Sequence, residues 1–245
     1  MLGSLRRSSR VTLQRMEQIR PYTDSRLAGQ CVYCGGVPDT GDHVPPRAFL
    51  DEPYPENLPK VPCCKACNEG ASLDEEYVAS LLEVAACGTA QPDELERPKI
   101  VRKLRESGAL RRRLERCLTA SDGQVAVVAE ADRVSHVIEK IGRALWAFEL
   151  GEPTAALTAD VWFAAIPALD SEALAKFTLI EASDVFPEVG SRLMFRHLVV
   201  NDELYCPAWQ DVQPGRFSYA IQLSGGGGTV KMIIRDYLAG RVEFS

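Results

Sequence analysis

Two Cys-x-x-Cys pairs constrain the fold of this chain more than any other feature of its sequence. The first pair is Cys31 and Cys34, and the second is Cys64 and Cys67. Four thiolates form the ligand set of a closed tetrahedral zinc site, and such a site supplies much of the folding free energy of a small module. The segment between the pairs, residues 35–63, is longer than the ~15–20 residues of an ordinary zinc ribbon. We therefore predict that a structural Zn²⁺ closes the base of a long insert.

The remaining cysteines bear on the ligand set and on the cellular compartment. A redox-active Cys-x-x-Cys pair is the competing interpretation. Cys63 stands beside Cys64 and is an alternative ligand, but the knuckle spacing favours Cys64, and Cys63 is expected to be a small buried hydrophobic residue. The other cysteines are scattered, which favours a reducing cytoplasm over a secreted, disulfide-linked protein; they are Cys87, Cys117 and Cys206.

The insert carries an acid followed by a histidine, in the segment DHVPP at 42–46, and the second cysteine pair is followed at once by Asn68. With these features, residues 31–77 resemble the zinc-bearing HNH endonucleases of the ββα-metal superfamily. The three motif positions fall on His43, Asn57 and Asn68, the last being a frequent variant of the final histidine. The rest of the chain resembles no family that we can name.

The resemblance implies a role for each polar residue of the motif. His43 would be the general base, because phosphodiester hydrolysis needs a group that takes a proton from water near neutral pH. Asp42 and Asn68 would coordinate one catalytic cation, and their oxygen ligands suit Mg²⁺ or Mn²⁺. Asn57 would support the loop that carries the histidine. The alternatives are a structural histidine, a turn cap at Asp42, a helix cap at Asn68 and a turn-forming Asn57 after Pro55.

One position departs from the family pattern. Many HNH sequences place a Lys or Arg a few residues after the final motif position, where it can neutralise phosphate. Here residues 69–76 are acidic. Arg47, which directly follows the DHVPP segment, is our candidate for the missing positive charge.

Positive charge is concentrated in two segments of an acidic chain. The net charge is −6, yet residues 1–30 contain six Arg against two acidic residues, and residues 97–118 contain nine Lys or Arg against two. Local basic patches determine the affinity for phosphate more than net charge does. We predict that a basic face holds the DNA backbone beside the nuclease without base specificity, the alternative being a solvated surface. This face consists of Arg102, Lys103, Arg105, Arg111, Arg112, Arg113 and Arg116.

The pattern along the chain predicts an α+β fold. The resemblance implies that this fold begins with a zinc-stapled ββα-metal HNH domain, which is followed by a mixed α+β C-terminal domain. We place a basic N-terminal arm at 1–26, the HNH domain at 27–90 and the C-terminal domain at 91–245. Apolar periodicity and a capping box at 72–75 predict helices at 76–86, at 98–118 with an interruption near Gly108, and at 134–150. Runs rich in β-branched residues predict strands at 124–130, 161–166, 177–180, 193–200, 218–223 and 230–234, with a hairpin connection at 225–228.

These features and the resemblance predict a metal-dependent HNH endonuclease that hydrolyses phosphodiester bonds, in DNA rather than RNA. Small HNH proteins often serve in phage biology or bacterial defence, and no feature of this sequence selects such a role. Two alternatives remain open: a non-catalytic zinc module that binds nucleic acid, and a nuclease effector gated by a C-terminal sensor domain. A homodimer or an activating protein partner is compatible with these functions. The sequence has no run of ~18 apolar residues, so no membrane span is expected, and its basic N-terminus lacks the apolar centre of a signal peptide, which again predicts the cytoplasm.

Overall fold

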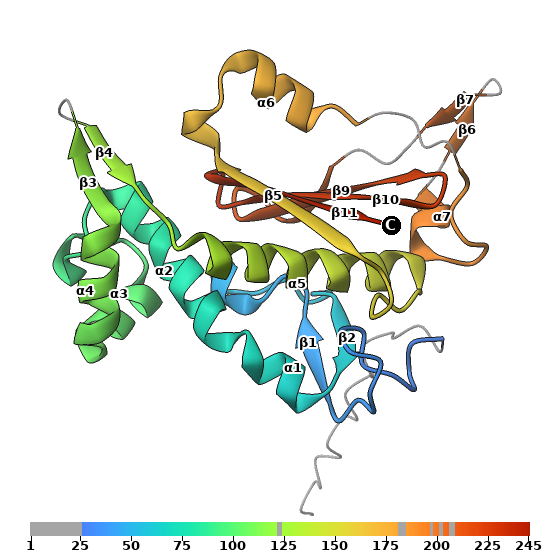
Figure 1. The fold of residues 1–245 in the computed structure, drawn as a ribbon, viewed down its shortest axis with the longest axis horizontal. Helices are drawn as coiled ribbons and strands as arrows, with labels where there is room; N and C mark the ends of the chain where they lie inside the picture. Colours follow the sequence, from blue (N-terminus) through green and yellow to red (C-terminus); the bar gives the residue numbers. More distant parts are fainter. Residues whose placement is uncertain (1–25, 122–123, 181–184, 197, 201–202, 206–208) are drawn as a thin grey trace, which may run out of the picture.

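The computed structural model describes residues 26–121, 124–180, 185–196, 198–200, 203–205 and 209–245 (Figure 1). Helices and strands do not alternate regularly along the chain, and every described strand pair is antiparallel. The predicted α+β class is therefore confirmed. The predicted N-terminal arm, apart from Arg26, and Cys206 lie outside the described residues. In the described part, no helix is both long and apolar enough to cross a membrane.

A β-hairpin and two helices form the cysteine-containing unit. The hairpin strands are β1 (Thr40–His43) and β2 (Lys60–Cys63), which pair antiparallel. The connection between them is irregular apart from the short 3₁₀ helix η1 (Arg47–Phe49), because its prolines fix φ and remove backbone donors. α1 (Lys65–Gly70) follows β2, and α2 (Ser72–Cys87) follows α1. The unit therefore has the order strand, strand, helix that the resemblance implied.

The start of α2 differs in detail from the prediction. Ala71 is the N-cap, and Ser72 is the first helical residue, so the predicted capping box does not form. The Ser72 hydroxyl instead donates a hydrogen bond to the carbonyl oxygen of Glu69, at 2.8 Å. This hydrogen bond joins α2 to the last turn of α1. The helix ends at Gly88, whose φ of 69° is the left-handed conformation that glycine adopts most easily.

The basic segment forms two helices, as predicted. α3 (Pro98–Glu106) and α4 (Gly108–Cys117) are separated at Ser107, whose hydroxyl caps α4 by accepting a hydrogen bond from the backbone of Leu110. The hairpin of β3 (Leu118–Ser121) and β4 (Gln124–Val127) follows. A 3₁₀ turn, η2 (Pro92–Glu94), precedes α3. These elements lie together at one end of the molecule (Figure 1).

The long helix α5 (Ala131–Leu150) lies between the cysteine-containing unit and a five-stranded antiparallel sheet (Figure 1). The order of the strands across the sheet is β5, β11, β10, β9, β8. Burial alternates along β10, so one face of the sheet packs against α5. The strand bounds are β5 (Ala159–Ala165), β8 (Gln210–Gln213), β9 (Phe217–Ser224), β10 (Gly227–Ile234) and β11 (Leu238–Phe244).

Two glycines allow α5 to lie close to the sheet. A Cβ atom added at Gly142 of α5 would lie 2.6 Å from a methyl carbon of Val242, and one added at Gly240 of β11 would lie 2.7 Å from the Ile138 side chain. Both distances are well below van der Waals contact, so a side chain at either position would push helix and sheet apart. The close packing therefore depends on glycine at both positions.

Two predicted strands are wrong at least in part. Residues 177–180 were predicted as a strand, but they include the end of the helix α6 (Ser171–Thr178). Asp170 is the N-cap of α6. The helix covers the outer face of the sheet, which it contacts through Phe177. Residues 193–200 were predicted as one strand, but they begin in the short helix α7 (Arg192–Arg196) and end in β6. Tertiary contacts outweigh β-propensity here: Phe177 lies 5.6 Å from Trp162, between ring centroids. The remaining elements are η3 (Ile166–Ala168), β6 (Leu198–Val200) and β7 (Glu203–Tyr205).

Packing is continuous across the predicted domain boundary at residue 90. One hydrophobic cluster includes residues of α2, α5 and the sheet. Asp51 of the insert adds a polar connection, because its carboxylate binds Arg97 before α3 and Arg216 and Arg235 in two turns of the C-terminal sheet. The cysteine-containing unit is thus fixed to the sheet, and a cavity between them has defined walls.

Candidate active site and metal centre

Four cysteines come together in the way the sequence predicted. The sulfur atoms of Cys31, Cys34, Cys64 and Cys67 all lie within 4.8 Å of one another. The Cys34 and Cys64 sulfurs are 3.8 Å apart, and Zn–S bonds of about 2.3 Å in a tetrahedron require edges of about 3.8 Å. The donor set and its size therefore fit a structural metal such as zinc. Cys63 is not part of the cluster, as predicted, and its side chain is buried at the end of β2.

Local backbone geometry prepares the cluster. Gly35 has a φ of 73° and donates its amide to the carbonyl of Cys31, which forms the tight knuckle of the first pair. Cys64 is the N-cap of α1, so this helix carries Cys67 back towards it. Burial opposes ionisation of Cys31, but the surrounding backbone amides, from Cys64 first, outweigh it and lower the pKa of this thiol to about 7. By contrast, burial raises the pKa of Cys63 to about 12, so that it stays a neutral thiol.

His43 lies at the end of β1, opposite Lys60 of β2. Its side chain is half-buried. Burial lowers the pKa of the imidazole below its ordinary value of 6.5, and the charges of Arg47 and Lys60 lower it further. The ring is therefore neutral at pH 7 and can accept a proton, as a general base must.

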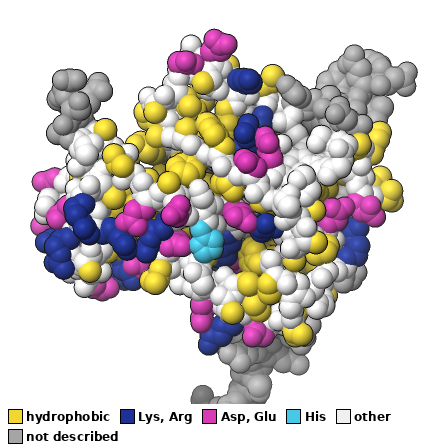
Figure 2. All heavy atoms as spheres, viewed as in Figure 1, with side chains coloured by type: hydrophobic (Ala, Val, Ile, Leu, Met, Phe, Trp, Pro, Cys, Tyr) yellow, Lys and Arg dark blue, Asp and Glu magenta, His cyan; other side chains and the backbone are white. Residues whose placement is uncertain are grey.

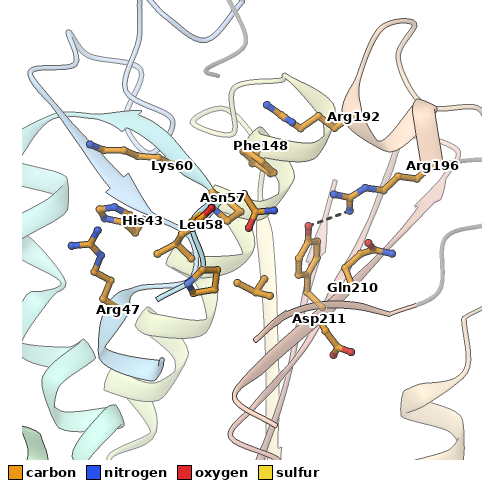
Figure 3. Close-up of a pocket in the computed structure, with 15 residues that line it drawn as sticks. His43, Arg47, Asn57, Leu58, Lys60, Phe148, Arg192, Arg196, Gln210 and Asp211 are labelled. Atoms are coloured by element: carbon orange, nitrogen blue, oxygen red, sulfur yellow. Dashed lines mark hydrogen bonds between the residues drawn. The ribbon is translucent and has the colours of Figure 1, made fainter. Parts of the chain in front are cut away.

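His43 lines a cavity of about 760 Å³ between the hairpin connection and the C-terminal sheet (Figure 3). His43, Arg47 and Lys60 lie on the wall formed by the cysteine-containing unit, while Arg192 and Arg196 approach from the facing wall. Four of the lining residues carry positive charge and two, Glu56 and Asp211, carry negative charge. The other lining residues are Pro55, Asn57, Leu58, Pro59, Phe148, Gln210, Val212 and Tyr219. The cavity thus suits an anionic group.

Both arginines of α7 are held in place by neighbours. A guanidinium nitrogen of Arg196 lies 2.9 Å from a carboxylate oxygen of Glu149, which is fully buried, and 3.2 Å from the Tyr219 hydroxyl, itself bound to Glu149. The Arg192 guanidinium lies 4.3 Å from the centre of the Phe148 ring, in cation–π contact. The sequence pattern did not reveal this pair, because Arg196 falls in a stretch predicted to be a strand, 193–200, and Arg192 lies just before it, whereas both belong to α7.

Asp42 faces away from the cavity, since successive side chains of a strand point to opposite faces. It is 7% exposed, and one of its carboxylate oxygens accepts hydrogen bonds from the Lys140 ammonium at 2.7 Å and the Tyr33 hydroxyl at 2.8 Å. Lys140, on α5, also binds Glu75. The predicted role of Asp42 as a cation ligand stays a prediction, and in this arrangement its carboxylate is occupied by a lysine that the sequence did not identify.

The remaining motif residues are only partly brought together. Asn57 and Arg47 line the cavity with His43, and Arg47 also lies over the Tyr54 ring. Asn68 lies on α1 and does not line the cavity. The loop that carries the histidine is joined to the opposite strand by the hydrogen bond from the Val44 amide to the Pro59 carbonyl, at 2.9 Å. The supporting role of Asn57 and the cation-binding role of Asn68 stay predictions.

The predicted basic face lies on α3 and α4, at the end of the molecule away from α7 (Figure 1). Figure 2 shows that its Lys and Arg side chains are mixed with acidic ones. The ion pairs are Lys103 with Glu76, Arg105 with Asp93, Arg111 with Glu115, and Arg113 with Glu130. These partners reduce the positive potential of the face, so its role in DNA binding stays a prediction.

Among known proteins, no family, curated protein or solved structure matches the chain.

Proposed function

We propose that this chain is an HNH-type endonuclease in which His43 takes a proton from the water that attacks a phosphodiester bond. One observation carries the proposal: a neutral, half-buried imidazole lines a cationic cavity, and it belongs to the same β-hairpin unit as a four-cysteine cluster. A phosphodiester is an anionic group, and a proton acceptor such as the His43 imidazole would help to hydrolyse it. The resemblance of residues 31–77 to HNH endonucleases supports the same activity.

The charges around the cavity support two further steps. Burial, together with the charges of Arg47 and Lys60, lowers the pKa of His43 and keeps it deprotonated, so that the base is ready at neutral pH. The same cations would attract the phosphate and stabilise the negative charge that grows on its oxygens during attack. Because Arg196 is held by buried Glu149, its position does not have to change for this task.

A divalent cation would supply stabilisation of the leaving oxygen in this chemistry. The arrangement of its predicted ligands does not fit a cation at the His43 cavity. Asp42 is bound by Lys140 and Tyr33 on the opposite face of β1, and Asn68 does not line the cavity. As the new P–O bond forms, the bond from phosphorus to the leaving oxygen breaks, and that oxygen takes a proton from solvent. The steps proposed above therefore use only the protein's own side chains and water.

The binding of Asp42 by Lys140 also favours a second candidate function. A zinc module in which Lys140 occupies the Asp42 carboxylate can bind nucleic acid without cutting it. In that case His43 and the arginines would hold phosphate only, and hydrolysis would be absent under all metal conditions.

The experiment measures cleavage of single-stranded DNA, duplex DNA and RNA by the full chain, with and without added Mg²⁺ or Mn²⁺. His43→Ala should lower the rate ~10²–10⁴-fold, the usual contribution of a general base, and leave the zinc content unchanged. His136→Ala is the matched control, because this histidine is exposed on α5 and binds Asp74 instead of lining the cavity. A His43→Ala variant that cuts as fast as its parent refutes the proposal. A parent protein that cuts nothing supports the zinc-module alternative.

A further inference from the structure

The C-terminal sheet and α7 form one wall of the cavity that contains His43. Arg192 and Arg196 extend from this wall towards the side of the cavity that carries the imidazole (Figure 3). If the C-terminal part of the chain were only a sensor domain, it would not need to place two cations in the wall of this cavity. The wall is also fixed, since Asp51 binds Arg216 and Arg235 across the same junction.

Arg196 is positioned in advance for an anion. Its partner Glu149 is completely buried on α5, and the second carboxylate oxygen of Glu149 has no hydrogen-bond partner among the described residues. Tyr219 donates its hydroxyl to the first oxygen, which holds the carboxylate in one orientation. The guanidinium is therefore held at the cavity wall through one of its nitrogens, which contacts both Glu149 and Tyr219. Its other two nitrogens would donate to a phosphate, which guanidinium groups bind in a bidentate manner.

The size of the cavity limits what can reach His43. A volume of about 760 Å³ corresponds to a sphere about 11 Å across, which is narrower than the major groove of B-DNA alone, about 12 Å. Both strands of a duplex cannot be enclosed in a space of this size. One strand can, and its backbone phosphates would meet positive charge on both walls.

We propose that the cavity holds an unpaired strand of nucleic acid, with a backbone phosphate bound by Arg192 and Arg196 opposite His43. This inference rests on the proposed nuclease function and specifies its substrate. Since the contacts involve phosphate and not base edges, binding is independent of base sequence. The C-terminal part of the chain is then a component of the substrate site.

The test measures binding, with fluorescence anisotropy, in the His43→Ala background so that no cleavage interferes. The probes are a labelled single-stranded DNA oligonucleotide, the same sequence as RNA, and the DNA sequence as a blunt duplex. Arg192→Gln should weaken single-strand binding at least about tenfold and lower the slope of log K against log salt by about 0.7, the value for one neutralised phosphate on a single strand. Its effect on duplex binding should be negligible.

Lys176→Gln is the matched control, because it removes one charge from an exposed residue of α6, on the outer face of the sheet. It should change neither affinity nor slope. Arg192→Lys keeps the charge and should recover part of the affinity, and thermal melting checks that each variant is folded. The proposal is overturned if Arg192→Gln leaves single-strand binding unchanged, or weakens duplex and single strand equally.

These outcomes are independent of the nuclease assay. If the parent protein cuts nucleic acid but Arg192→Gln binds single strands normally, only the substrate assignment fails. If the parent cuts nothing but Arg192→Gln loses single-strand binding, the assignment of the cavity stands and the catalytic function fails.

Discussion

Replacing Lys140 with Met should destabilise the protein by about 3–5 kcal/mol at pH 7, the usual effect of removing one partner from a buried ion pair. The Lys140 side chain is 6% exposed, and its partners Asp42 and Glu75 are 9% and 15% exposed. Methionine keeps most of the side-chain volume but leaves two buried carboxylates without their counter-ion. The loss is large compared with the ~5–15 kcal/mol by which a typical domain is stable.

The pH dependence of this loss has a definite sign. Burial opposes the charge of Lys140, but Asp42 and Glu75 outweigh it and raise the pKa of the ammonium above its ordinary value of 10.5. A group whose pKa is raised by folding stabilises the folded state below its unfolded-state pKa, and this contribution is lost as pH rises through the folded-state pKa. The difference between parent and variant should therefore be constant from about pH 7 to 9 and shrink above pH 10.5.

Urea unfolding followed by tryptophan fluorescence, at constant Zn²⁺, measures the free energy of unfolding. Lys65→Met is the matched control, because the Lys65–Glu69 pair is 3.7 Å apart with both side chains mostly exposed, and loss of such a pair costs less than about 1 kcal/mol. A triple variant with Asp42→Asn, Glu75→Gln and Lys140→Met should recover most of the stability, since no charge is left buried. A loss below about 1 kcal/mol for Lys140→Met would show that water screens the network, and would refute the reasoning.

Three more perturbations test the zinc cluster, the base and the basic face. Cys34→Ser should remove the bound zinc and unfold the cysteine-containing unit, because a structural zinc site supplies folding free energy. Metal analysis measures the zinc content, and circular dichroism measures the loss of structure. Freshly purified parent protein without zinc would contradict the prediction. Because the pKa of His43 is lowered, kcat/KM should rise with pH, with a midpoint below pH 6.5. Lys60→Gln should move that midpoint to higher pH, because it removes one of the charges that lower the pKa. A midpoint above pH 6.5 in the parent protein would be inconsistent with His43 as the base. Changing the three arginines at 111–113 to Glu should flatten the salt dependence of duplex DNA binding by about 0.9 for each phosphate that the face no longer neutralises; an unchanged slope would identify the basic face as solvated surface.

The sequence alone was sufficient to predict the features that depend on local patterns. The four-cysteine cluster follows from spacing, because two knuckles brought together by one hairpin place their sulfurs around one point. The helices α3, α4 and α5 follow from apolar periodicity and from the break near Gly108. The hairpin between β9 and β10 follows from the glycine run at 225–228.

The two wrong strand predictions occur in short segments whose structure depends on residues that are distant in sequence. The segment of Phe177 is rich in strand-forming residues, yet it is helical because its ring packs between two tryptophans from other parts of the chain. The segment of Arg192 has no periodicity long enough to distinguish a helix from a strand. The edge strand β8 carries a single apolar residue, Val212, and its pairing with β9 becomes visible only in the structure.

The candidate site divides in the same way. His43, Arg47 and Asn57 belong to one segment, so a local motif identified them. Arg192, Arg196 and Glu149 reach the site only because α5 and α7 place residues more than 90 positions away beside the hairpin, and Lys140 reaches Asp42 for the same reason. Ionic interactions act through space over a few ångströms. Tertiary packing therefore decides which charged residues form ion pairs, and the spacing of these residues in the sequence does not predict the pairs.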